Sequence, residues 1–295
     1  MSHPGDIFYA KMNIPASEPP SQSIMRAARL LAEADAMIVT AGAGMGVDSG
    51  MPDFRGEAGL WRAYPALGRA RLHFAKIASP QRFADNPRLA WGFYGHRLNL
   101  YRATAPHEGF HILRKIAARL PHGAFVFTSN VDGHFQRAGF DEERVVECHG
   151  SIHWLQCLQP CADEIWPATE LHPDIDEEHC ELLSAPPLCP RCHRLARPNI
   201  LMFGDWGWID RREREQMARL NTWRAGVRSP VVLEIGAGQA IPTVRHFGEV
   251  QGCPLIRLNP RDGAVRRSED VSLPMNGLEG LRAIAQALGG FAAGD

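Results

Sequence analysis

Three glycines interrupt the segment AMIVTAGAGMGV, which covers residues 36–47 and begins with an apolar run. They are Gly42, Gly44 and Gly46. A backbone without side chains lets a ligand approach closely, although glycine is also the usual residue of a tight turn that binds nothing. The spacing departs from the dinucleotide pattern G-x-G-x-x-G, because Val47 occupies the place of the last glycine. The glycines therefore indicate either a nucleotide-binding loop or a bare strand-to-helix turn.

The same loop continues into Asp53, Phe54 and Arg55, which bring together a carboxylate, an aromatic ring and a guanidinium. An arginine can bind a phosphate through two parallel hydrogen bonds. This tripeptide favours a phosphate-bearing ligand over a bare turn.

Asn130 and Asp132 stand two positions apart after the apolar run GAFVFT at residues 123–128. In an extended chain, side chains two positions apart lie on the same side, so the amide and the carboxylate can enter one cleft. Such a pair can recognise a carboxamide. The alternative is a turn that caps the following helix, because Asn and Asp favour caps.

His149 stands at the end of a predicted strand in VVECHG, just before Gly150. An imidazole near neutral pH can accept a proton from a hydroxyl in a transition state. The chain contains 13 histidines, so a histidine alone does not indicate catalysis. The position of His149 at a strand end makes it the candidate general base.

Four of the seven cysteines form two close pairs with the spacings C-x3-C and C-x2-C. The pairs are Cys157 with Cys161 and Cys189 with Cys192, whereas Cys148, Cys180 and Cys253 stand apart. Two pairs of thiolates are typical of a structural tetrahedral zinc site, and they leave no open position for a catalytic water. An odd number of cysteines does not fit a disulfide framework, so we expect a reducing compartment and a cytoplasmic protein.

Short apolar runs predict the strands that position these residues. The runs cover residues 36–44, 123–130, 199–205, 230–238 and 253–260. Helical patterns separate several of them, notably at residues 109–120 and 211–223. Buried strands that alternate with helices predict an α/β fold with a Rossmann-like parallel sheet covered on both faces. In such sheets, ligands bind at the carboxyl ends of the strands, where the candidate residues fall.

Two segments do not follow this alternation: an aromatic-rich one at residues 60–106 and the cysteine-bearing one at residues 150–198. We assign both, from residue 63 onwards, to a smaller helical and zinc-binding domain. The predicted boundaries are a flexible N-terminal segment at 1–21, a Rossmann-like domain at 22–62, 107–149 and 199–295, and a small domain at 63–106 and 150–198.

Composition excludes several classes of partner. The formal net charge is -1, and no run of basic residues gathers on one predicted helix, which argues against direct nucleic-acid binding. The apolar runs are too short to span a bilayer, and the N-terminus lacks the basic-then-apolar order of a signal peptide. We therefore expect no membrane partner.

In order along the chain, these segments resemble the sirtuin family of NAD-dependent protein deacylases. The family pattern G-A-G-x-S-x-x-S-G-x-P-x-F-R is similar to GAGMGVDSGMPDFR, and T-Q-N-[IV]-D is similar to TSNVD. His149-Gly150 resembles the family's H-G, residues 236–238 resemble its G-T-S, and Leu258-Asn259 resembles its I-N. The resemblance spans residues 25 to about 285 and includes the cysteine pairs.

The resemblance implies an NAD site, a structural zinc and an acylated lysine of a protein as substrate. It implies that Asn130 and Asp132 hold nicotinamide and that His149 draws a proton from the nicotinamide ribose. In that mechanism the acyl oxygen attacks the anomeric carbon as nicotinamide leaves, and the acyl group ends on ADP-ribose. The residues implied in NAD binding are Gly42, Ala43, Gly44, Asp53, Phe54, Arg55, Ser129, Asn130, Asp132, Gly236, Ala237, Gly238 and Asn259.

Three departures from the family pattern bear on activity. Gly46 and Ser129 stand where the family has serine and glutamine, which reduces the contacts expected with NAD. FGDWGW at residues 203–208 stands where many members have F-G-E-x-L-P, and it adds Trp206 and Trp208 to the loop that lines the acyl-lysine groove.

Tyr94 and Arg97 stand three positions apart in WGFYGHR, a spacing that places a phenol and a guanidinium on one helical face. They could bind a carboxylate together, or they could be a core tyrosine beside a solvated arginine. The segment also resembles the sirtuin branch that removes succinyl and malonyl groups, in which such a pair reads the acidic acyl end. Glu57 argues against this assignment, because that branch tends to have alanine there.

Two other functions remain open on the sequence. The same site could serve a mono-ADP-ribosyltransferase or an NAD glycohydrolase, in which protein or water takes the ribose. A non-catalytic NAD-binding protein is the second alternative, and the presence of His149, Asn130 and Asp132 argues against it.

Overall fold

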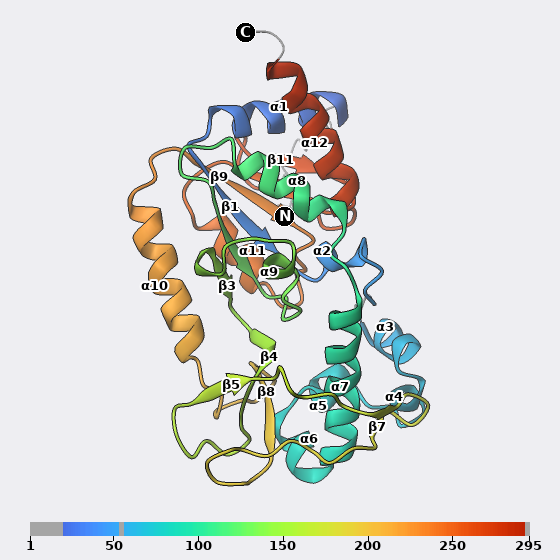
Figure 1. The fold of residues 1–295 in the computed structure, drawn as a ribbon. Coiled ribbons are helices and arrows are strands. Elements are labelled where there is room, and N and C mark those ends of the chain that lie inside the picture. The colour runs from blue at the N-terminus through green and yellow to red at the C-terminus, as the bar shows by residue number, and fades with distance from the viewer. Residues whose placement is uncertain (1–19, 53–55, 293–295) are drawn as a thin grey trace, which may run out of the picture.

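The computed structural model describes residues 20–52 and 56–292 of the chain. Figure 1 shows a larger lobe, in which helices enclose a twisted sheet, and a smaller lobe of short helices and short strands. Among the described residues, no helix combines the length and the apolar character that a membrane span requires.

A six-stranded sheet forms the centre of the larger lobe, in the order β11-β10-β9-β1-β2-β3. All of its strand pairs are parallel. Val39 in the middle of β1 lies opposite Val126 of β2 and Leu233 of β9. The strands are β1 (Ala36–Ala41), β2 (Ala124–Thr128), β3 (Val145–Glu147), β9 (Pro230–Ile235), β10 (Leu255–Leu258) and β11 (Val271–Leu273).

Helices cover both faces of this sheet. On one face, Leu31, Leu113 and Ile284 join a core with Val39 and Leu233. The first three side chains belong to α1 (Pro20–Glu33), α8 (Glu108–Ala117) and α12 (Gly277–Ala292), respectively. The other face packs against α10 (Arg211–Ala225) and α11 (Thr243–Glu249), which contribute apolar side chains to two smaller clusters. Each fully buried Leu or Ile side chain contributes about 1.5–3 kcal/mol, so both faces stabilise the sheet.

The smaller lobe combines short helices with antiparallel strands around a second apolar core. Its helices are α3 (Gly56–Ala63), α4 (Pro65–Arg69), α5 (Phe74–Ile77), α6 (Pro80–Asp85) and α7 (Pro87–Ala103). Its strands are β4 (Gly150–Cys157), β5 (Ile165–Pro167), β6 (Ile175–Asp176), β7 (Glu181–Leu182) and β8 (Ala196–Ile200). The longest of these helices, α7, begins with Pro87, and the Asn86 side chain accepts the Leu89 N–H at 3.0 Å. Three short elements stand next to strands of the large sheet along the chain. The helix α2 (Gly44–Val47) follows β1, and α9 (His134–Arg137) and the 3-10 turn Glu142–Arg144 lie between β2 and β3.

The predicted α/β class and parallel sheet are confirmed, but one predicted strand belongs elsewhere. The apolar run at 199–205 is not part of the parallel sheet, because β8 pairs antiparallel with β4 at an edge of the sheet β5-β4-β8. Pro198 suits an edge, since it cannot donate a ladder hydrogen bond. Leu201 and Phe203, which made the run look buried, are 39% and 42% exposed.

Candidate active site

A cavity of about 510 Å³ opens at the carboxyl ends of β1, β2 and β9, where a doubly wound sheet binds its ligands. The predicted residues that line it from the large lobe are Gly42, Ala43, Ser129, Asn130, Asp132, His149, Gly236, Ala237 and Gly238. Tyr94 and Arg97 line it from α7 of the small lobe. The fold therefore brings most of the candidate residues to one place.

The loops after β1 and β9 interlock at the floor of the cavity. Gly42 donates its N–H to Ile235 O at 3.0 Å, and Gly44 donates to Gly236 O at 3.1 Å. A Cβ on Gly42 would lie 2.8 Å from the Ala237 Cα, and one on Gly236, whose φ is +60°, would lie 2.4 Å from the Gly44 Cα. These glycines are required by the contact between the loops, and Gly44 itself does not line the cavity.

Asn130 and Asp132 combine the two roles that the sequence left open. The Asn130 amide donates to Gly42 O at 3.0 Å, which ties the turn after β2 to the first glycine loop. One oxygen of Asp132 accepts the His134 N–H at 2.9 Å, in the turn that leads into α9. Both residues also line the cavity.

His149 is placed by the glycine that follows it. Gly150 has φ +75°, and a Cβ there would lie 2.0 Å from Asn199 O, so only glycine allows β4 to approach β8 so closely. The His149 carbonyl then accepts the Leu201 N–H at 2.9 Å. Burial lowers the pKa of the His149 imidazole, so the ring is neutral at pH 7. A neutral imidazole beside a cavity can act as a general base.

Tyr94 and Arg97 lie on one face of α7, as their spacing predicted, but they do not form a phenol–guanidinium hydrogen bond. The Arg97 Cζ lies 5.7 Å from the centroid of the Tyr94 ring. Two of the guanidinium N–H groups donate to the Tyr101 hydroxyl instead. Burial raises the pKa of Tyr94 to about 12, so its phenol keeps its proton.

One predicted ligand of the cofactor lies behind the wall of the cavity. Asn259 is completely buried and does not line the cavity. Its amide donates to Ala237 O at 2.9 Å, and its oxygen accepts the backbone N–H groups of Arg261 and Asp262. Asn259 therefore supports the loop after β9 from behind. Asp53, Phe54 and Arg55 lie outside the described residues.

Sequence reasoning missed several residues that line the cavity. Besides Gly46 they include Phe74, Tyr101, Leu201, Phe203 and Ile241. Tyr101 follows Arg97 by four residues, so helical periodicity on α7 could have identified it. Phe203 is the first residue of the unusual FGDWGW segment, and Leu201 lies two residues before it, whereas nothing in the pattern singled out Phe74 or Ile241.

A buried ion pair shapes the FGDWGW loop. The Arg197 guanidinium donates to Asp205 Oδ1 at 2.8 Å, and both side chains have no exposed surface. The carboxylate also accepts the backbone N–H groups of Met202 and Gly207, each at 3.2 Å. Asp205 therefore holds the turn that leaves Trp206 fully exposed.

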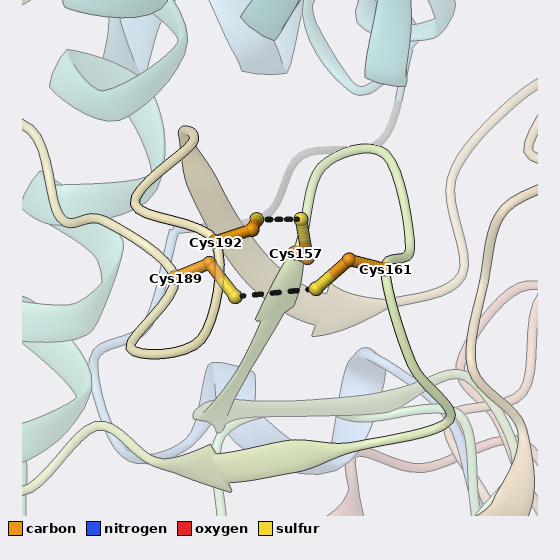
Figure 2. A group of neighbouring side chains, drawn as sticks. All are labelled: Cys157, Cys161, Cys189 and Cys192. Atoms are coloured by element: carbon orange, nitrogen blue, oxygen red, sulfur yellow. Dashed lines mark hydrogen bonds between the residues drawn. The ribbon is translucent and has the colours of Figure 1, made fainter.

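The four paired cysteines converge in the small lobe, as predicted (Figure 2). Their sulfur atoms lie within 4.8 Å of one another, with Cys157–Cys192 at 3.6 Å and Cys161–Cys189 at 3.7 Å. Zinc–sulfur bonds of about 2.3 Å in a tetrahedron place the sulfurs roughly 3.8 Å apart, so this set fits zinc. The Arg194 Nε lies 3.5 Å from the Cys192 sulfur, where it can offset the charge of four thiolates.

The fold and the site together are typical of a nucleotide-binding α/β protein. Its smaller lobe carries four cysteines that can bind zinc. The profile of the Sir2 family matches residues 42–221. The chain therefore belongs to the Sir2 family, the sirtuins, and the resemblance seen in the sequence is confirmed.

Relatives with assigned names match along most of their length. An NAD-dependent protein deacylase of Aquifex aeolicus is 28% identical over 251 residues, which is 84% of this chain and 93% of that protein. NAD-dependent protein deacylase 2 of Pyrobaculum aerophilum is 31% identical over 255 residues, or 84% of this chain and 88% of that protein.

Solved structures share the fold. A mutant Sir2 homologue in complex with ADP-ribose superposes with a TM-score of 0.68 at 21% identity, covering 92% of this chain and 98% of that one. A Sir2 homologue–NAD complex has a TM-score of 0.66 at 21% identity, covering 90% of this chain and 94% of that one.

Proposed function

We propose that this protein is an NAD-dependent protein lysine deacylase that releases nicotinamide and O-acyl-ADP-ribose. The observation that carries the proposal is that His149 lines the same cavity as Asn130 and Asp132, and burial lowers the pKa of its imidazole. The relatives named as deacylases support the same activity, and the solved Sir2 structures with NAD and ADP-ribose share the fold.

Each group in the cavity has a role in this reaction. NAD, when bound, supplies a glycosidic bond to nicotinamide that is activated for attack by the acyl oxygen. The glycine loops at Gly42 and Gly236 shape the floor beside the phosphates, and Gly238 leaves open space there, since a Cβ on it would meet no atom within 4 Å. Asn130 and Asp132 bind the carboxamide, and His149 accepts the proton of a ribose hydroxyl.

The acyl group is a further part of the proposal. Tyr94 and Arg97 line the small-lobe side of the cavity, and Arg97 places a buried positive charge there. A charge in this position favours an acidic acyl group such as succinyl or malonyl over acetyl. Arg97→Met is expected to lower desuccinylation much more than deacetylation.

Zinc, localisation and partners complete the proposal. The four cysteines hold one structural zinc, which keeps the small lobe folded and takes no part in catalysis. Free thiols and this zinc site favour a cytoplasmic protein. Its partners are NAD and acylated lysines of proteins, with no nucleic acid or membrane surface.

Incubation with NAD and a panel of acetyl-, succinyl- and malonyl-lysine peptides tests the proposal. We expect deacylated peptide together with acyl-ADP-ribose. If the products are ADP-ribosylated protein or free ADP-ribose with the peptides intact, the protein is a transferase or a glycohydrolase instead.

A further inference from the structure

Two charged side chains interrupt the apolar strands β9 and β10. Glu234 and Arg257 lie opposite each other in the register of the two strands, and they are 0% and 2% exposed. The Arg257 guanidinium donates to both carboxylate oxygens of Glu234, at 2.6 and 3.0 Å. A buried ion pair contributes little net stability, because desolvation offsets the attraction between its charges. The further contact of this pair leads toward the cavity.

Arg245 of α11 connects the buried pair to the loops at the carboxyl ends of β9 and β10. Its Nη2 lies 3.8 Å from Glu234 Oε1, and the side chain is 11% exposed. The same nitrogen donates to Ala237 O at 3.1 Å and to Asp262 O at 2.8 Å. Ala237 lies just after β9 and Asp262 lies after β10. One guanidinium nitrogen therefore joins the two loops.

The segment between β9 and Arg245 forms one wall of the cavity. The lining residues from this segment are Gly236, Ala237, Gly238, Ala240, Ile241, Thr243 and Val244. Arg245 follows them directly but does not line the cavity, and its bond to Ala237 O closes the segment on itself. In a doubly wound sheet, a dinucleotide binds across the carboxyl ends of the strands. Arg245 thus holds, from behind, a wall that a nucleotide would contact.

We propose that Arg245 is a positioning residue that holds the segment 236–244 in the conformation that binds the nucleotide part of NAD. This inference rests on the proposed NAD-dependent function and adds to it a residue outside the cavity. Glu234 offsets the charge of the buried guanidinium. Because Glu234 keeps Arg257 as its bidentate partner, the loss of Arg245 frees the segment without leaving an unpaired carboxylate in the sheet.

Isothermal titration calorimetry with ADP-ribose measures the nucleotide contacts without nicotinamide and without turnover. Arg245→Met is expected to raise the Kd of ADP-ribose by about tenfold, because hydrogen bonds from a charged donor no longer keep the binding conformation populated. In steady-state assays the KM for NAD should rise similarly, whereas kcat at saturating NAD and the KM for the acyl peptide should change less than about threefold. A variant that had only lost folded protein would lose kcat and keep its KM for NAD.

Arg224→Met is the matched control, because Arg224 also donates to two backbone carbonyl oxygens. These belong to Val227 at 3.2 Å and Gln251 at 3.5 Å, which precede β9 and β10. They lie at the amino ends of the strands, so the Kd of ADP-ribose should not change. Arg245→Lys should recover much of the affinity lost in Arg245→Met, because one ammonium can donate both of the bonds that Nη2 makes.

Three results would overturn the inference and leave the NAD-dependent reaction standing. The first is an unchanged Kd of ADP-ribose in Arg245→Met, and the second is an equal rise in Arg224→Met. The third is an Arg245→Met variant that does not fold, because the residue would then hold the whole domain together instead of one wall of the cavity. A wild-type protein that binds neither ADP-ribose nor NAD refutes the proposed function itself.

Discussion

At the scale of single residues, burial lowers the pKa of His149, the proposed general base. The pKa of His149 is lowered by burial, so the neutral form persists to more acidic pH than in a free imidazole. We therefore predict that the acid limb of the kcat/KM profile has an apparent pKa below 6.5, and that His149→Ala lowers kcat by about a hundredfold or more while NAD still binds. An acid limb above 6.5 in the wild type, or full turnover in a folded His149→Ala variant, would contradict the assignment.

The residue types that carry chemistry were readable from the sequence, but their partners were not. The order of the glycine, Asn-Asp and His-Gly motifs sufficed to place Asn130, Asp132 and His149 in one cavity. The sequence could not show that the close contact between two loops requires glycine at positions 42 and 236. It also could not show that the Asn259 side chain bonds to the loop after β9 instead of lining the cavity. Such roles depend on contacts between segments far apart in the chain.

At the scale of elements, the approach of β4 to β8 fixes the position of His149. Gly150→Ala places a Cβ against Asn199 O and forces a non-glycine residue to φ +75°. We predict a loss of unfolding free energy of at least about 1–3 kcal/mol in urea titrations, with reduced activity because His149 shifts. Gly226→Ala, at the end of α10 with φ -88° and no atom closer than 3.5 Å, should stay within about 0.5 kcal/mol of wild type. Equal stability of the two variants would argue against this close contact.

Local pattern predicted most elements of the large lobe, because the strands of a parallel sheet are apolar on both faces. The runs at 36–44, 123–130, 230–238 and 253–260 contain β1, β2, β9 and β10. The run at 199–205 was misleading, since the exposed Leu201 and Phe203 supplied its apolar character at the mouth of the cavity. The edge position of β8 depends on its pairing with β4, which no local pattern encodes.

At the scale of the whole molecule, the four-cysteine cluster brings together two distant segments of the small lobe. Cys157 and Cys161 lie at the end of β4 and just after it, and Cys189 and Cys192 precede β8, so a zinc ion held by them would connect the two ends of this long segment. We predict one tightly held zinc per chain, and loss of fold in Cys189→Ala, because binding energy at such a site is folding energy. Cys180→Ala, at a cysteine outside the cluster, should keep its zinc in metal analysis. Zinc-free wild type, or loss of zinc from Cys180→Ala, would refute this ligand set.

In the proposed reaction, the whole active site couples the release of nicotinamide to the transfer of an acyl group from lysine to ADP-ribose. The most direct test is a mass balance in one reaction, in which chromatography and mass spectrometry quantify nicotinamide, unmodified lysine peptide and acyl-ADP-ribose from the preferred acyl peptide. We predict equal amounts of the three products at every time point, all of them abolished together in His149→Ala. Nicotinamide released in excess of deacylated peptide, or ADP-ribose found on protein or free in solution, would contradict the claim.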